Sequence, residues 1–367
     1  MASAYLVNFN KLLIKKLQKM IPVTSYAAMD SNTPLVPYSF ERRAVGPNDV
    51  QIEILFCGVC HSDLHQVKNE WGGSNYPMVP GHEIVGKVIS VGSNVTKFKE
   101  GDIAGVGVMV DSCKTCKTCT QDLEQYCEEG FTGTYNNKER KSNQITMGGY
   151  STKIVVDEYY TFKISPSLPL AAVAPLLCAG ITTYSPLVYA GVKKGMKVAV
   201  VGLGGLGHMG VKFAVSFGAE VTVISTSPAK EADAKKLGAT HFLVSTDKEA
   251  MTKYNSYFDV ILDAISANHD YTTYLNLLGI DGKLMVVGLP IESPKVQPFS
   301  LVTNRRSVIG SCIGGIKETQ DMLDYCATHN IVSEIEVIPM QKINEAYDRM
   351  LKGDVKYRFV IDLASLK

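Results

Sequence analysis

The chain has 367 residues, 46% of them hydrophobic and 20% charged, and its formal net charge is +1. This length predicts two domains, and the near-neutral charge gives no electrostatic basis for a nucleic-acid or membrane partner. No apolar run reaches the roughly 20 residues that span a bilayer. The nine cysteines are too sparse for a disulfide scaffold and follow no signal-peptide core, so we expect a cytoplasmic protein.

Residues 1–22 differ from the rest of the chain. Their lysines have no acidic neighbours, and five apolar residues recur at helical spacing: Leu6, Phe9, Leu13, Leu17 and Met20. A weak targeting or interface helix has this pattern, but the absence of arginine argues against a mitochondrial presequence. We interpret residues 1–22 as an N-terminal extension.

The hydrophobic pattern changes near residue 180. Before it, apolar stretches such as "DVQIEILFCGVC" and "GHEIVGKVISVGSNV" alternate with period 2, so residues 25–160 should be mostly β. After it, strand and helix patterns alternate, in "MKVAVVG", "GHMGVKFAVSFGA", "EVTVIS", "AKEADAKKLG", "HFLV", "FDVILDAI" and "GKLMVVG". This alternation predicts βαβ units with a parallel sheet, and hence an α/β protein.

Four of the cysteines lie close together in "VDSCKTCKTCTQDLEQYC", residues 110–127. The spacing C-x2-C-x2-C-x7-C lets four thiolates converge on one tetrahedral ion, whereas disulfides between such near neighbours would be strained. The alternative, exposed free cysteines, would leave oxidisable thiols on a surface loop. We predict a structural zinc site at Cys113, Cys116, Cys119 and Cys127.

A glycine-rich turn stands between a predicted strand and a predicted amphipathic helix. Gly202, Gly204 and Gly207 form G-x-G-x-x-G, and Gly205 and Leu206 complete it. The glycines permit a tight turn, a close approach to a pyrophosphate and close packing of helix on strand, and the helix N-terminus offers free N–H groups. This context predicts dinucleotide binding.

The next predicted strand, "EVTVIS", is not followed by the acidic residue that NAD would favour. Hydroxyl groups and a cation follow it instead, from Ser225, Thr226, Ser227 and Lys230. An acid here would repel a 2′-phosphate, so the replacement favours NADP(H). A plain strand-to-helix loop with an N-cap serine is the alternative interpretation.

A second set of candidate metal ligands lies outside the cysteine-rich loop. The segments "CGVCHSDLH", "PGHE" and "LLCAGIT" contain Cys60, His82 and Cys178, a Cys2His set that would leave a catalytic zinc one open position. Such long spacing does not establish convergence, and each residue alone is more often core than ligand. We interpret Cys57 and Cys312, which lie in apolar stretches, as core.

These motifs together resemble the zinc-containing medium-chain alcohol dehydrogenases, and among them the cinnamyl alcohol dehydrogenase subfamily. The match follows family order over about residues 25–363, through "GVCHSDLH", "PGHE", the cysteine-rich loop, "GGYS", "LLCAGITTYSPL", "GLGGLGH", "STSPAK" and "GSCIGG…ETQ". The resemblance implies a mainly β, GroES-like catalytic domain over 23–174 and 313–367 and a Rossmann domain over 175–312. The active site should lie between them, and a homodimer should form through the Rossmann edge near "RRSVIGSCIGG".

The resemblance also implies roles at the catalytic zinc, which would make two zinc ions per chain. Cys60, His82 and Cys178 would be its ligands, and Glu83 would approach the metal when no substrate is bound. Asp63 would orient His82 and raise its basicity.

Further implied roles concern the proton and the cofactor. Ser62 and His65 would form a proton relay to solvent. Thr182 would lie near the nicotinamide of NADP(H), and Arg358 would reach the pyrophosphate. The implied reaction is zinc-dependent interconversion of aldehydes and primary alcohols, in which NADPH provides the hydride.

The substrate prediction follows from departures within the resemblance. Phe131 and Thr132 stand where the plant lignin enzymes have a bulky tryptophan, so the chain is closer to bacterial and fungal aldehyde reductases. Met109 and Trp71 are candidate pocket residues. We predict reduction of aromatic, α,β-unsaturated or medium-chain aldehydes.

The sequence disfavours two alternative functions. An NAD-linked polyol or small-alcohol dehydrogenase is disfavoured by the missing acid after "EVTVIS". A non-catalytic, zinc-bearing structural protein on the same fold is disfavoured because Ser62, His65 and all the catalytic-zinc ligands are present.

Overall fold

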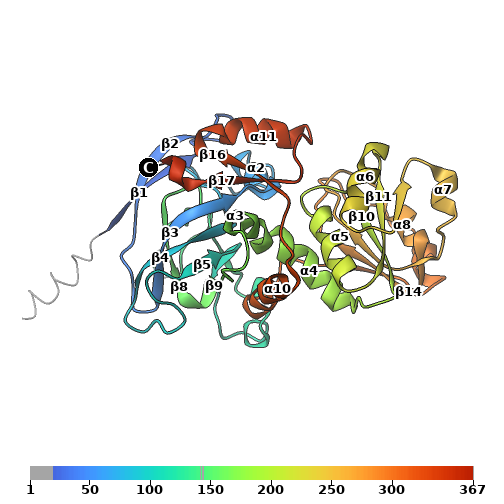
Figure 1. The fold of residues 1–367 in the computed structure, drawn as a ribbon, viewed down its shortest axis with the longest axis horizontal. Helices are drawn as coiled ribbons and strands as arrows, with labels where there is room; N and C mark the ends of the chain where they lie inside the picture. Colours follow the sequence, from blue (N-terminus) through green and yellow to red (C-terminus); the bar gives the residue numbers. More distant parts are fainter. Residues whose placement is uncertain (1–19, 141, 143, 367) are drawn as a thin grey trace, which may run out of the picture.

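The computed structural model describes residues 20–140, 142 and 144–366, and Figure 1 shows two lobes with α4 (Ala179–Ala190) and α10 (Ile316–His329) between them. The predicted N-terminal extension falls almost entirely outside the described residues. Strand β1 (Ile21–Ala27) begins at the end of this extension and pairs antiparallel with β2 (Val36–Arg42).

The first lobe is built on a seven-stranded, mostly antiparallel sheet. Its order is β16-β17-β3-β4-β5-β9, with β8 also paired to β3. The bounds are β3 Asp49–Gly58, β4 Ile84–Val91, β5 Ile103–Val106, β8 Lys153–Asp157, β9 Phe162–Lys163, β16 Ile335–Pro339 and β17 Arg358–Asp362. The two longest predicted strand segments correspond to β3 and β4. Along β3 the side chains largely alternate between buried and partly exposed. This lobe is therefore mainly β, as predicted.

The second lobe contains a six-stranded parallel sheet in the order β12-β11-β10-β13-β14-β15. Counted along the chain, this is the order 3-2-1-4-5-6 of dinucleotide-binding folds. The strands are β10 Lys197–Val201, β11 Glu220–Ser225, β12 His241–Val244, β13 Phe258–Asp263, β14 Leu278–Val286 and β15 Ser307–Gly310. The helices are α5 Gly207–Ser216, α6 Glu231–Lys236, α7 Lys248–Thr252, α8 Tyr271–Leu277 and α9 Pro298–Val302.

Strand β10 is apolar from Val198 to its end because helices cover both faces of the sheet. Val198 and Val200 belong to the large core cluster that also holds α5, whereas Ala199 and Val201 belong to a separate cluster with α8. A strand buried on both faces needs a continuous apolar run instead of alternation. The sequence "KVAVV" supplies that run, and it places the end of β10 at the glycine-rich turn.

The remaining elements join the lobes or cover the sheets. They are α2 His61–Val67, β6 Met109–Asp111, β7 Thr132–Gly133, α3 Leu170–Val173, α11 Ile343–Leu351, and the 3-10 turns η1 Cys119–Gln121, η2 Glu124–Tyr126, η3 Glu158–Tyr160, η4 Ala174–Leu177, η5 Pro228–Lys230, η6 Met340–Lys342 and η7 Leu363–Leu366. Within the described residues no single helix is long and apolar enough to cross a bilayer, although the bent pair Leu170–Leu177 and Ala179–Ala190 together reach that length.

We propose that the chain passes between lobes near Cys178 and again near Cys312. Turn η4 packs against β3, β4, β5 and β17 of the first lobe, whereas α4, which follows directly, packs against α5, β13 and β14 of the second. After β15 the chain returns, and α10 packs against α4 and β9. These contacts support domain bounds close to residues 174 and 313.

The prediction for the two isolated cysteines is half right. Cys57 is fully buried in β3. Cys312 is exposed, which contradicts its interpretation as core. The physical reason is that β15 is the edge strand of its sheet and ends at Gly310, so no neighbouring strand covers the residues that follow.

Candidate active site

Three distant segments bring four potential ligands together in the first lobe. Cys60 lies between β3 and α2, His82 and Glu83 directly precede β4, and Cys178 lies between η4 and α4. One ligand atom from each lies within 4.8 Å of all the others, and all four residues are buried. The convergence that the sequence spacing left open is therefore present.

Asp63 fixes two of these residues at once. Its Oδ1 lies 3.0 Å from His82 Nδ1, and its Oδ2 accepts a hydrogen bond from the backbone N–H of Cys60 at 2.9 Å. Burial opposes a charge on His82, but the neighbouring Asp63 raises the pKa of His82 well above its ordinary value. Because Nδ1 faces the carboxylate, Nε2 is the nitrogen available to a metal ion.

The two thiols of the cluster are electrostatically linked. A hydrogen bond with Cys178 lowers the pKa of Cys60 well below its usual value, and the same bond together with burial raises the pKa of Cys178. The pair therefore favours one thiolate and one thiol. A divalent cation between the sulfurs would stabilise both as thiolates.

Glu83 is buried with one oxygen satisfied and one not. Its Oε1 pairs with Nη2 of Arg358, and its Oε2 has no hydrogen-bond partner within the described part of the chain. Burial raises the pKa of Glu83 to about 7, although Arg358 acts in the opposite direction. A Cβ at Gly58 would lie 1.9 Å from Oε2, so only glycine leaves room for this carboxylate.

These observations fit a catalytic zinc ion. Two thiolates and an imidazole form a donor set that zinc prefers, and three protein ligands leave one position open. A carboxylate oxygen of Glu83 belongs to the same cluster, and a cation there would offset the charge of this carboxylate, whose Oε2 is otherwise without a partner among the described residues. We propose Cys60, His82 and Cys178 as its ligands, with Glu83 beside them.

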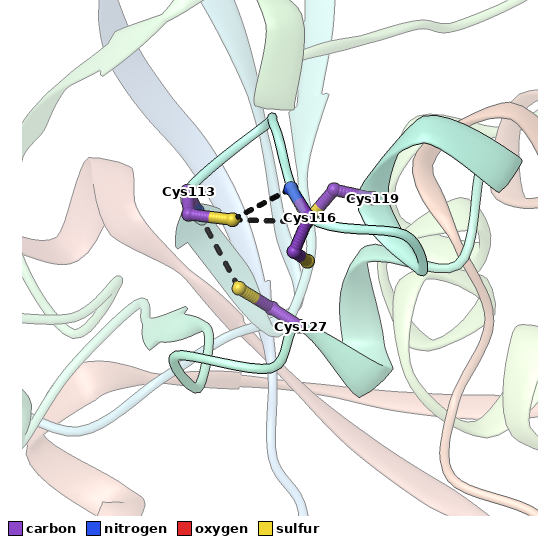
Figure 2. A group of neighbouring side chains, drawn as sticks. All are labelled: Cys113, Cys116, Cys119 and Cys127. Atoms are coloured by element: carbon purple, nitrogen blue, oxygen red, sulfur yellow. Dashed lines mark hydrogen bonds between the residues drawn. The ribbon is translucent and has the colours of Figure 1, made fainter.

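The four cysteines of the loop between β6 and β7 form the second cluster (Figure 2). Their sulfurs also lie within 4.8 Å of one another, all are free thiols, and Cys113 Sγ is 3.9 Å from Cys119 Sγ. A zinc tetrahedron with bonds of ~2.3 Å has a sulfur–sulfur edge of about 3.8 Å. The backbone N–H of Cys116 donates to Sγ of Cys113, and the backbone N–H of Glu128 donates to Sγ of Cys116. The cluster fits a structural zinc.

The cysteine-rich loop is anchored to the connection between the lobes. Glu124 is fully buried; its Oε2 accepts a hydrogen bond from the N–H of Ile316 at 3.0 Å, at the start of α10. The hydroxyl of Tyr126 accepts a hydrogen bond from the N–H of Cys312 at 3.2 Å. A metal ion in this loop would therefore also hold the segment that returns from the second lobe.

The glycine-rich turn has the geometry that its sequence predicted. Gly202 has φ of +89°, a conformation that favours glycine. A Cβ on Gly207 would lie 1.9 Å from the carbonyl oxygen of Gly202, so helix α5 approaches β10 too closely for any other residue. A Cβ on Gly205 would lie 2.9 Å from Cδ of Arg358. Arg358 thus lies between the turn and Glu83.

Two family models match the chain, the alcohol dehydrogenase GroES-like domain over residues 46–166 and the zinc-binding dehydrogenase over residues 205–328. NADP-dependent alcohol dehydrogenase C 1 of Mycolicibacterium smegmatis is 54% identical over 349 residues, which cover 95% of this chain and 100% of that protein. The chain belongs to the zinc-containing medium-chain alcohol dehydrogenases.

Two other similar proteins refine this placement. Aldehyde reductase YahK of Escherichia coli is 52% identical, with 94% of this chain and 99% of that protein covered. The solved structure of a cinnamyl alcohol dehydrogenase from Sorghum bicolor superposes with a TM-score of 0.92 at 46% identity, covering 94% of this chain and 99% of that one. The predicted fold and the predicted resemblance to the cinnamyl subfamily are confirmed.

Other predicted residues of this dehydrogenase lie around the two sites. Ser62 and His65 share a face of α2, and Ser62 Oγ is 3.6 Å from Cys60 Sγ. Thr182 is buried in the first turn of α4, where its N–H donates to the carbonyl of Cys178. Met109 is buried and lines a small cavity with Leu177, beside Cys178.

The predicted 2′-phosphate residues lie at the end of β11. Ser225 is buried as its last residue, Thr226 is exposed, and Ser227 is half-buried. Lys230 donates from Nζ to the carbonyl of Leu203 at 2.9 Å. This bond holds the cation of Lys230 at the glycine-rich turn.

Sequence reasoning missed Glu70. Its carboxylate pairs with Nδ1 of His65, and the indole of Trp71 lies 5.0 Å from the His65 ring between centroids. Trp71 is 45% exposed, so it covers His65 from the solvent side. The sequence does place an acidic residue five positions after His65, just beyond the end of α2. No turn motif there predicted that the chain brings this carboxylate back to His65.

Proposed function

We propose that this dehydrogenase interconverts aldehydes and primary alcohols with NADP(H) at its catalytic zinc site. The observation that carries the proposal is the position of Arg358, which pairs with Glu83 in the metal cluster and lies against Gly205 of the glycine-rich turn. The metal site and the dinucleotide site are therefore adjacent, as reacting groups must be. The relatives named NADP-dependent alcohol dehydrogenase and aldehyde reductase support the same reaction.

The protein's own residues then have distinct tasks. Zinc held by Cys60, His82 and Cys178 supplies Lewis-acid polarisation of a carbonyl oxygen, and the nicotinamide supplies the hydride chemistry. Asp63 keeps His82 oriented with Nε2 free. Gly58 and Arg358 keep the Glu83 carboxylate beside the ligands.

Proton movement falls to α2. Ser62 donates its hydroxyl proton to the substrate oxygen during reduction and regains a proton from His65. His65 is half-buried and its Nδ1 contacts the carboxylate of Glu70, so a proton taken up at Nδ1 lets the ring release one from Nε2. Exchange with solvent at this half-buried ring then restores the proton.

NADP(H) is favoured over NAD(H) by the groups at the end of β11. Ser225, Thr226, Ser227 and Lys230 provide hydroxyl donors and one cation, and no carboxylate follows the strand. Charge-assisted hydrogen bonds to a 2′-phosphate are about twice as strong as neutral ones.

The substrates we propose are aromatic, α,β-unsaturated or medium-chain aldehydes. Met109 supports this range because its flexible thioether repacks around different apolar groups, and Trp71 offers an exposed aromatic face near the relay. Each buried methylene contributes only ~1–3 kcal/mol of discrimination, so the preference should be graded.

We also propose a homodimer formed through the edge of the six-stranded sheet. Edge strand β15 and the segment that precedes it in the chain expose large apolar side chains: Ile291 at 86%, Phe299 at 78%, Val302 at 71% and Val308 at 39%. A second copy covering this face would remove that apolar area from water. Light scattering should give the mass of two chains, and the mass of one chain would contradict this.

A reducing compartment, the cytoplasm, suits the two thiol clusters. Zinc needs thiolates, and the cysteines of both clusters are free. Disulfides found within either cluster in protein isolated under native conditions would contradict this proposal.

The proposed reaction is tested by following loss of NADPH absorbance with cinnamaldehyde, benzaldehyde, hexanal and acetaldehyde on one preparation. We expect turnover with all four aldehydes and the lowest kcat/KM for acetaldehyde. A best rate with acetaldehyde would replace the proposal with a small-alcohol dehydrogenase. No turnover with any aldehyde or alcohol would favour a structural protein.

A further inference from the structure

His208 is a buried histidine that the metal site and the proton relay do not use. It is the second residue of α5, directly after the glycine-rich turn, and its side chain has 0% exposure. Its Nδ1 lies 3.2 Å from the carbonyl oxygen of Gly204, and its Nε2 lies 3.0 Å from Oγ of Ser333. Its ring stacks on Tyr357 with 4.8 Å between centroids.

These contacts fix the protonation of the ring. A carbonyl oxygen only accepts hydrogen bonds, so Nδ1 carries the hydrogen that faces Gly204. Burial, together with the positive charge of Arg358, lowers the pKa of His208 to about 3, so the ring is neutral and Nε2 carries no hydrogen. Nε2 therefore accepts from the hydroxyl of Ser333, whose other acceptor, the carbonyl of Glu334, is farther away at 3.4 Å.

The Gly204 carbonyl consequently accepts two hydrogen bonds from one residue. The backbone N–H of His208 donates to it at 3.0 Å, and the ring donates from Nδ1. Both bonds hold the carbonyl toward the helix. In a planar trans peptide the next N–H points the opposite way, so the N–H of Gly205 points out of the helix N-terminus.

The space on the outer side of this peptide suits a ligand. A Cβ on Gly204 would meet no described atom within 4 Å, and the helix N-terminus attracts anions. We propose that His208 is a positioning residue for the cofactor, which locks the Gly204–Gly205 peptide so that the Gly205 N–H faces the pyrophosphate. This inference rests on NADP(H) binding as proposed above.

The same helix supplies a matched control. Lys212, one turn after His208, donates from Nζ to the carbonyl of Val332 at 2.6 Å and to the Glu334 carboxylate at 2.8 Å. Like the bond from His208 to Ser333, these contacts join α5 to the segment before β16. They do not involve the glycine-rich turn. Removing them therefore weakens the contact between α5 and the segment before β16 without changing the hydrogen bonds to the Gly204 carbonyl.

The test is the dissociation constant for NADPH, measured by calorimetry on the whole protein. His208→Leu, which removes the donor at Nδ1, should weaken binding at least ~5-fold, because the side-chain hydrogen bond that orients the Gly204 carbonyl is lost. Lys212→Met should stay within ~2-fold of the unaltered protein. Equal affinity for His208→Leu and the unaltered protein, or an equal loss in Lys212→Met, would overturn the inference.

Two polar substitutions cover the case in which His208→Leu does not fold. The amide of His208→Asn lies near the position of Nδ1 and should recover most of the affinity, whereas that of His208→Gln extends toward Ser333 and should not. If the two bind NADPH equally, the Gly204 contact does not position the cofactor. If the unaltered protein binds no NADPH, the proposed function itself fails and takes this inference with it.

Discussion

The carboxylate of Asp63 lies 3.0 Å from Nδ1 of His82 and also accepts the N–H of Cys60, so one buried acid holds two candidate ligands. Its Oδ1 further accepts the N–H of Gly81 at 3.0 Å, which fixes the backbone before His82. We propose that Asp63 positions the metal ligands without binding the metal itself.

Asp63→Asn should weaken zinc binding at this site by ~10–100-fold, because the amide turns a donor toward groups that themselves donate to the carboxylate. Zinc retained against a graded chelator measures the effect. The zinc of the cysteine-rich loop serves as the internal control and should be unchanged. Equal retention of both ions in Asp63→Asn and the unaltered protein would reject the role given to Asp63.

The two zinc sites should respond differently to loss of a ligand. Cys116→Ser should lose one zinc and lower the melting temperature, because structural zinc stabilises the fold directly and this loop also holds Ile316 through Glu124. Cys178→Ala should keep about one zinc per chain and remain folded. Metal analysis and calorimetry measure both effects. Fewer than about two zinc ions per unaltered chain would contradict the assignment.

The parts of the site that follow one another in sequence were predictable without the structure. The cysteine-rich loop and the glycine-rich turn are each local, so spacing and flanking strand or helix patterns were enough. The catalytic ligands are far apart in sequence, and only the family resemblance, not spacing, indicated their convergence.

The missed residues have contacts that depend on the tertiary fold. Glu124 meets Ile316 across 192 positions, and His208 meets Ser333 across 125 positions. No local pattern encodes such a pairing. Cys312 was interpreted wrongly because an apolar stretch does not reveal whether its strand lies at the edge of a sheet.

Cofactor preference should depend on the end of β11. The unaltered protein should use NADPH with kcat/KM at least ~100-fold above that for NADH, and Lys230→Ala with Ser225→Asp should erase the preference. The exposed helix α6 offers a control in Lys235→Ala, which breaks only the ion pair with Glu231. Equal use of both cofactors by the unaltered protein would exclude the proposed role of these residues.

His269 should make stability depend on pH. Its Nε2 lies 2.7 Å from Oδ2 of buried Asp263, and its Nδ1 lies 2.7 Å from the carbonyl of Ala267, so both nitrogens face acceptors. Burial opposes the charge, but the bonds to Asp263 and Ala267 outweigh it and raise the pKa of His269. The stabilisation is therefore fully present below the unfolded value of ~6.5 and is lost as pH rises through the raised pKa.

The corresponding experiment compares His269→Asn with the unaltered protein by urea unfolding at about pH 6 and about pH 9. The substitution should cost about 1–3 kcal/mol at the lower pH and less at the higher one. A cost for His269→Asn that does not change with pH would show that the ring is not charged in the fold.

We propose that this protein reduces aldehydes with NADPH at the site formed by Cys60, His82 and Cys178. The most direct measurement is kcat/KM for cinnamaldehyde with NADPH, for the unaltered protein and for Cys178→Ala with its fold and cysteine-loop zinc verified. We predict ready turnover by the unaltered protein and a loss of at least ~1000-fold in the variant, since both the metal and its field are removed. Undiminished turnover by Cys178→Ala, or none by the zinc-loaded unaltered protein, would contradict the claim.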